Sequence, residues 1–257
     1  MPPLPREHGA YAQLAAPLVT TLVVAGVSAS ALALAAAGVV AFLAHESLLV
    51  VLGVRGPRAK REAGGRVAAW LLALVAVAAA SALAALASGP ADLTRWLLWP
   101  LVPAIVVLAA ATRGLEKRWP VEVLVALTFA FVALPLGHAA GADARRVWTV
   151  AAPFAVVFVA STIAVRGVLL HGRPTASPAA ALAARLGAVA IAVAGVGLLA
   201  LAASRDLLPW TSPLAAAPGA LAAIALALRP PSLRHLHAVG WTLGAVTIAT
   251  ALVLMLA

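Results

Sequence analysis

The fold is decided where a short polar N-terminus meets a long apolar run, in the stretch Pro5–Gln13, PREHGAYAQ. Charged and polar side chains gather at the start of this run, and apolar residues follow it. A bilayer has a hydrocarbon core of roughly 30 Å, which takes about 20 residues of helix to cross. The stretch therefore predicts a membrane helix that begins with polar groups, which a plain anchor would not need.

The composition of the whole chain is typical of a membrane protein. Of the 257 residues, 64% are hydrophobic and 10% are charged, whereas a soluble domain carries about 25% charged residues. The formal charge of +10 comes from short loops between apolar runs, so we expect membrane lipids and no nucleic acid as partners. The chain has no Cys, which excludes disulfides and thiolate chemistry. We expect one integral membrane domain.

Apolar runs of about 17–25 residues predict nine transmembrane helices, since unpaired backbone groups in lipid force each run to be helical. The fold class is therefore an all-α polytopic transmembrane helical bundle. The run 210–228 gives the weakest prediction because Pro213 and Pro218 interrupt it. The expected spans are 9–27, 30–54, 67–88, 96–112, 121–140, 147–170, 186–204, 210–228 and 239–257.

The loop charges predict the orientation of the bundle. With the N-terminus in the cytoplasm, fourteen of the 18 Lys and Arg residues fall in cytoplasmic segments. Positive charge concentrates on the cytoplasmic side of membrane proteins, so we expect the N-terminus inside and the C-terminus outside. This bias supports the span 210–228, because without it the basic loop 229–238 would change sides.

Glu46 is the most informative polar residue inside a span. It lies about 12 Å of helix from the cytoplasmic end of the second span, too far for a carboxylate to reach the headgroups, so it must be protonated or paired. His45 is its neighbour in sequence, and Arg166 lies near the inner end of the sixth span. Glu46 either belongs to a polar cavity or bonds to a neighbouring helix, and Arg166 either points inward or snorkels to the interface.

Three more polar segments complete the candidate site: the N-terminal stretch, the basic loop 55–61 and the segment 171–175. Each also has a structural interpretation, as a helix-dipole partner, an orientation signal or an interfacial group. We expect a cytoplasm-facing cavity that accepts a lipid-soluble or anionic ligand, and no metal or cofactor. The candidate ligand-binding residues are Arg6, Glu7, His8, Gln13, His45, Glu46, Arg55, Arg58, Arg166, His171 and Arg173.

The opening Arg6–Leu14, REHGAYAQL, followed by Pro17, resembles the start of the YwiC-like bacterial membrane proteins. The number of spans and the length of the chain are similar as well. This resemblance implies a multi-pass protein of the bacterial cytoplasmic membrane, in a family without an established activity.

More distantly, the layout resembles the UbiA prenyltransferase superfamily, which has nine helices and carboxylate motifs at the cytoplasmic ends of the second and sixth spans. There the carboxylates hold magnesium and an isoprenyl diphosphate. Here the window 44–61 retains only Glu46, and the window 166–175 has no carboxylate. An enzyme acting on an isoprenoid or quinone-like lipid is therefore an alternative, with direct contact between arginine and diphosphate in place of the metal. A transporter is a further alternative, ranked third because polar residues in the outer halves of the spans are few.

Overall fold

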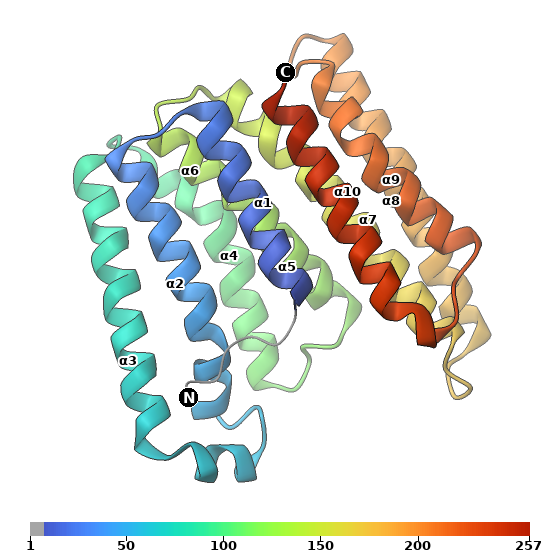
Figure 1. Cartoon of the computed structure of the whole chain (residues 1–257), viewed down its shortest axis with the longest axis horizontal. Coiled ribbons are helices and arrows are strands. Elements are labelled where there is room, and N and C mark those ends of the chain that lie inside the picture. Colours follow the sequence, from blue (N-terminus) through green and yellow to red (C-terminus); the bar gives the residue numbers. More distant parts are fainter. Residues whose placement is uncertain (1–7) are drawn as a thin grey trace.

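The computed structural model describes residues 8–257, which form a bundle of helices without a strand in that range (Figure 1). The apolar runs fold as predicted because a helix satisfies its own backbone hydrogen bonds. The helices are α1 His8–Ala25, α2 Ala29–Val51, α3 Pro57–Ser88, α4 Leu93–Thr112, α5 Trp119–Phe131, α6 Ala133–Ala139, α7 Ala144–His171, α8 Pro178–Ser204, α9 Thr211–Leu228, the 3₁₀ helix η1 Leu233–His235 and α10 Leu236–Met255.

Eight helical segments in the described part of the chain are long and apolar enough to cross a membrane, and they confirm the multi-pass helical bundle. The eight include α5 and α6 counted together, as Trp119–Ala139, and α9, the span predicted least securely. The remaining expected span corresponds to α1. Its 18 residues make about 27 Å of helix, slightly less than the hydrocarbon core.

Two spans differ from their predicted form. The third begins ten residues earlier than expected, at Pro57, and bends at Gly64, whose φ of 55° lies outside the helical region. The fifth divides at Val132 into α5 and α6. Pro135, one turn further on, has no amide hydrogen to donate to the carbonyl of Phe131, so the helix cannot continue regularly there.

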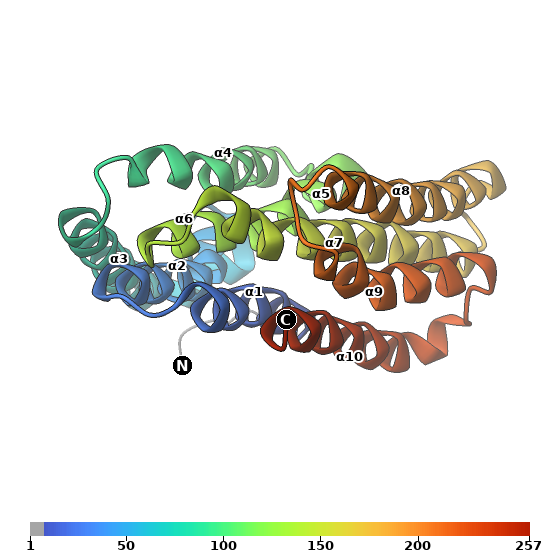
Figure 2. The same ribbon diagram turned by 90° about the horizontal axis from the view of Figure 1, so that it is seen from above.

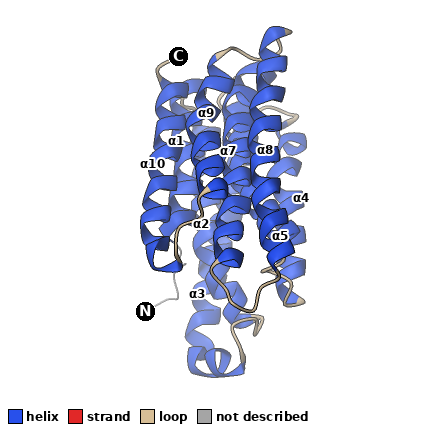
Figure 3. Ribbon diagram, turned by 90° about the vertical axis from the view of Figure 1, so that its right-hand side faces the viewer, coloured by secondary structure: helices blue, strands red, loops and turns tan. Residues whose placement is uncertain are grey.

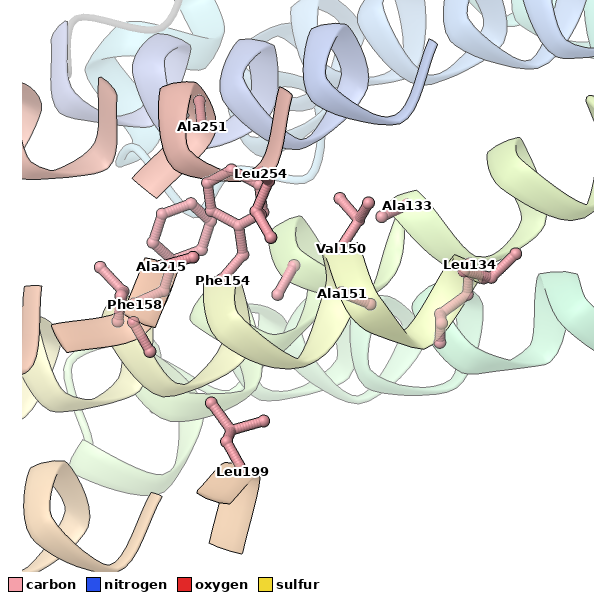
Figure 4. Close-up of a cluster of buried hydrophobic side chains, with 14 of the residues drawn as sticks. Ala133, Leu134, Val150, Ala151, Phe154, Phe158, Leu199, Ala215, Ala251 and Leu254 are labelled. Carbon is pink, nitrogen blue, oxygen red and sulfur yellow. The ribbon is translucent and has the colours of Figure 1, made fainter. Parts of the chain in front are cut away.

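Helix α7 lies in the middle of the bundle and α3 at its edge (Figure 2). α7 contacts α1, α5, α6, α8, α9 and α10, whereas α3 packs mainly on α2. Phe154 and Phe158 of α7 are fully buried and meet apolar side chains of the neighbouring helices (Figure 4). The core is therefore organised around α7.

Small residues bring the helices around α7 close together. A Cβ atom added at Gly219 of α9 would lie 2.5 Å from Cγ1 of Val157 on α7. Lipid is as apolar as a leucine side chain, so helices in a membrane associate through such close packing and not through a hydrophobic drive. This explains why the chain contains so many Ala and Gly residues in its spans.

The helices run along one common direction and so define two ends of the bundle (Figures 1 and 3). The loops predicted to be cytoplasmic lie together at one end, here called the basic end, which comprises residues 46–66, 113–122, 166–185 and 229–235. These ranges carry thirteen Lys and Arg residues and four Glu residues. The opposite end comprises residues 26–30, 89–96, 136–148 and 205–212. Which end faces the cytoplasm stays a prediction.

Candidate functional site

Glu46 forms an ion pair with Arg55 at the end of its own helix. Nε of Arg55 donates to Oε1 of Glu46 at 2.8 Å, and its terminal nitrogen donates to Oε2 at 2.7 Å. The Glu46 side chain is 20% exposed and that of Arg55 is 39% exposed. Two parallel hydrogen bonds to one carboxylate give the pair both charge and a fixed geometry. The carboxylate inside the second span is therefore paired, as one of the two predictions required.

The turn after α2 places Arg55 in position for this pair. Gly53 has a φ of 79°, and the amide of Val54 donates to the carbonyl of Leu49, which closes the helix with a Schellman motif. α4 ends in the same way: Gly114 has a φ of 69°, and Leu115 donates to Ala110. Glycine at these positions lets each chain turn away from its helix, so that Arg55 and the loop 113–118 are presented at the basic end.

The loop 113–118 also contacts Arg55. A terminal nitrogen of Arg55 lies 4.0 Å from Oε1 of Glu116. The other carboxylate oxygen of Glu116, Oε2, is buried and has no hydrogen-bond partner among residues 8–257. Glu116 is therefore incompletely neutralised, while Glu46 receives both hydrogen bonds.

Arg166 of α7 reaches the same loop from the other side. It donates to Oε2 of Glu122 at 2.8 Å and to the carbonyl of Lys117 at 3.2 Å. The side chains of Arg166 and Glu122 are 26% and 32% exposed. The side chain of Arg166 thus contacts other parts of the protein at the basic end. The loop 113–118 lies between two arginines, one from α7 and one from the turn after α2.

We call Glu46, Arg55, Glu116, Glu122 and Arg166 the carboxylate–arginine network. Within residues 8–257, Glu46 and Arg166 form no ion pair with each other: each has its own partner, and loop 113–118 connects the two pairs. Sequence reasoning missed Glu116 and Glu122. A usable signal was present, since only eight residues of the chain are acidic and these two flank the start of a span.

The other predicted site residues are distributed around this network. Gln13 is half-buried on α1, and His45 is half-buried on α2 beside Glu46. Arg58 donates to Glu62 at 2.7 Å on the exposed start of α3. The remaining predicted residues are exposed or not described: His171 and Arg173 lie exposed after α7, while Arg6, Glu7 and the side chain of His8 are outside the described part of the structure.

A further arginine ties the basic end together. Arg185 of α8 donates from its guanidinium to the carbonyls of Ala227 and Leu228, the last two residues of α9. Its side-chain stem passes Gly167 of α7 at a distance that leaves little room for a Cβ atom there. A cation at a helix C-terminus satisfies the free carbonyls and interacts favourably with the helix dipole. This arginine therefore stabilises the end of α9.

The opposite end has a different polar centre. Nε2 of His138 on α6 lies 2.7 Å from Oδ1 of Asp92, which precedes α4. The hydrogen bond with His138 lowers the pKa of the Asp92 carboxyl below its ordinary value. The ring of Trp96 stacks on that of His138 with 5.0 Å between the centroids. This centre joins the start of α4 to α6.

Within residues 8–257, no three His, Asp or Glu side chains lie close enough together to hold a metal ion. In the network an arginine lies against each carboxylate. The network holds two guanidinium groups in fixed positions beside a strongly basic surface. This arrangement suits the recognition of phosphate or carboxylate groups.

Comparison with known protein families gives a match that covers the first half of the chain. The YwiC-like protein family matches residues 4–136 of the chain, from the N-terminal stretch to α6. The search of curated proteins and the search of solved structures give no match. The matched region is more than half of the chain and contains the whole network apart from Arg166. The chain belongs to the YwiC-like family of multi-pass membrane proteins.

Proposed function

We propose that the protein is a binding protein of the bacterial cytoplasmic membrane that holds an anionic amphiphile at the basic end. The ligand class is a lipid-soluble chain with a phosphate, diphosphate or carboxylate headgroup, such as an isoprenyl diphosphate. One observation carries the proposal: two half-exposed arginines, one from the turn after α2 and one from α7, converge on a single short loop. That loop adds Arg113, Lys117 and Arg118, all of them exposed.

The electrostatics of the basic end favour an anion. Its residues include thirteen Lys and Arg against four Glu, so most of its cations lack a carboxylate. Arg55 contacts Glu46 through two hydrogen bonds and Glu116 at the longer distance of 4.0 Å. A bound phosphate would replace Glu116 as a partner of the Arg55 guanidinium, while Glu46 keeps the guanidinium oriented. Arginine suits this role because its planar fork matches phosphate geometry.

A UbiA-like enzyme is a second candidate, favoured by the position of the network. Arg55 follows the second span and Arg166 lies near the end of the sixth, the two windows in which that superfamily carries its motifs. Magnesium is held by carboxylates together with substrate phosphates. The residues here do not fit that ion, because the carboxylates of the network are separated by arginines. A reaction at this site would have to use arginine to neutralise a diphosphate.

Ligand binding is tested on the whole protein in lipid nanodiscs, with an isoprenyl diphosphate and a quinone as probes. We expect the diphosphate to bind and Arg55→Gln and Arg166→Gln to weaken it about tenfold or more each, since a hydrogen bond to a charged group contributes about 1.5–3 kcal/mol. Arg58→Gln is the matched control, because Arg58 also pairs with a glutamate but stands outside the network.

Equal weakening by Arg58→Gln and Arg55→Gln would reduce the proposal to general attraction by a basic surface and so reject it. Consumption of the diphosphate by the wild-type protein, with an acceptor lipid present, would favour the enzyme over the binding protein. The quinone has a neutral headgroup and the diphosphate an anionic one, so the two probes distinguish recognition of the anion from recognition of the apolar chain. Tight quinone binding that Arg55→Gln leaves unchanged would contradict recognition of an anion.

A further inference from the structure

Two apolar grooves lie next to each other on the half of the bundle nearer the opposite end. The first, of 480 Å³, runs between α4 and α5 and is lined by Leu98, Trp99 and Val102 of α4 with Leu127 and Phe131 of α5, among others. The second, of 340 Å³, lies between the start of α7 and the loop before α9. Its walls are Ala144, Trp148, Ala152, Leu207 and Leu208. Both volumes are within the range of about 300–1,000 Å³ found for ligand pockets.

A partition of three aromatic rings separates the grooves. The ring of Trp99 lies 5.1 Å from that of Trp148 and 5.5 Å from that of Phe131, centroid to centroid. Trp148 and Phe131 are 6.1 Å apart. Trp99 and Phe131 line the first groove, and Trp148 lines the second. The two grooves are therefore neighbours, with one layer of rings between them.

Each groove has one arginine in its lining, Arg95 in the first and Arg145 in the second. Arg95 is four residues before Trp99 and Arg145 is three before Trp148, so each arginine shares a helix face with its tryptophan. α4 and α7 both begin at the opposite end. Since the two tryptophan rings touch, both arginines lie about one turn beyond the partition, toward the membrane surface.

The two arginines carry charge that the described part of the chain does not compensate. Within residues 8–257 neither guanidinium has a hydrogen-bond or ion-pair partner. Both stand in the first turn of a helix, where the dipole disfavours a cation. The nearest carboxylates in sequence are engaged, Asp92 with His138 and Asp143 with the amide of Arg146. An anion bound between the arginines would relieve both costs.

We propose that the grooves and their arginines form a binding site for an anionic diacyl phospholipid. One acyl chain lies in each groove, the aromatic partition separates the chains, and Arg95 and Arg145 hold the phosphate. Two adjacent grooves match the two chains of a diacyl lipid, and tryptophan is typical of the membrane interface at this depth. The site is separate from the carboxylate–arginine network at the other end of the bundle and does not depend on the function proposed for it.

The test uses native mass spectrometry of the whole protein with four added lipids: phosphatidylglycerol, phosphatidylcholine, phosphatidylethanolamine and single-chain lysophosphatidylglycerol. We expect phosphatidylglycerol to be retained at least fivefold more than each of the others. Arg95→Gln and Arg145→Gln should each abolish most of this preference. Arg146→Gln is the matched control, because it removes the same charge next to Arg145 without lining a groove.

A second pair of variants fills the grooves without changing charge. Val102→Trp and Leu207→Trp, both at exposed lining positions, should bring diacyl retention down to that of the single-chain lipid. Leu198→Trp, exposed on α8 outside both grooves, should have no effect. Equal retention of single-chain and diacyl lipid by the wild-type protein would overturn the proposal. The same would follow if Arg146→Gln reduced retention as much as Arg145→Gln.

Discussion

At the basic end the helices are joined by arginine–carboxylate pairs, whereas at the opposite end they are joined by aromatic rings. Arginines occur at both ends, but Arg55 and Arg166 have carboxylate partners while Arg95 and Arg145 have none within residues 8–257. The same residue type thus serves as a tie between helices at one end and as a free cation at the other. The comparison teaches that the position of an arginine near the end of a span does not reveal whether it has a carboxylate partner.

Of the single-residue variants, one that breaks the aromatic partition should reduce the free energy of unfolding most. Trp148→Ala removes ring contacts with Trp99 and Phe131, and we expect it to lower the free energy of unfolding by about 3 kcal/mol, the lower end of the range for such truncations. The loss should not change with salt, since no charge is involved. Unfolding in detergent micelles at low and high salt measures both quantities. Trp119→Ala is the control, because Trp119 is 58% exposed; an equal loss there would contradict the assignment.

Breaking the tie at Arg166 should have the next largest effect. Arg166→Ala leaves Glu122 and the Lys117 carbonyl without their donor, and we expect a loss of about 2 kcal/mol. High salt should reduce the difference from the wild type, because the pair is partly exposed. Adding Glu122→Gln should recover part of the loss, since the unpaired charge is then removed. Additive losses in this double-mutant cycle would show that the two residues are not coupled.

The spans could be predicted from the sequence because their signal is local. Eight of the nine apolar runs form helical segments long enough to cross a bilayer within residues 8–257, and this holds even for α9 with Pro213 and Pro218 inside it. Glu46 also stood out, because a carboxylate deep in a span requires a partner. The boundaries of α3 were less predictable, since the polar segment before the bend at Gly64 resembles a loop in composition.

The partners could not be predicted, because they depend on which helix faces meet. In a membrane both the buried and the lipid-facing sides of a helix are apolar, so hydropathy does not distinguish them. Arg55 lies nine residues after Glu46 and reaches it only because the chain turns back at Gly53. The pair of Glu122 with Arg166 joins positions 44 residues apart. The sequence indicated which residue needed a partner but not which one supplied it.

A smaller effect is expected at the polar centre of the opposite end. The hydrogen bond from His138 lowers the pKa of Asp92 below its ordinary 3.8, so the pair favours the folded state above about pH 4 and loses this contribution as the pH falls further. Asp92→Asn should remove this part of the acid dependence of the melting temperature. Asp206→Asn, at the same end, should leave it unchanged. If the melting temperature of Asp92→Asn depended on acid pH as strongly as that of the wild type, other carboxylates would be responsible for the dependence.

The smallest effect is expected for the pair of Arg58 and Glu62, which sharpens the contrast with Arg166 at the same end. Its side chains are 87% and 64% exposed, and the residues are one helical turn apart on α3. Exposed pairs at this spacing contribute about 0.3–0.5 kcal/mol, because water screens the charges and ordering the side chains costs entropy. Arg58→Ala should therefore change the free energy of unfolding by less than a quarter of the change from Arg166→Ala. Comparable losses for the two variants would mean that burial against loop 113–118 does not determine the strength of these ties.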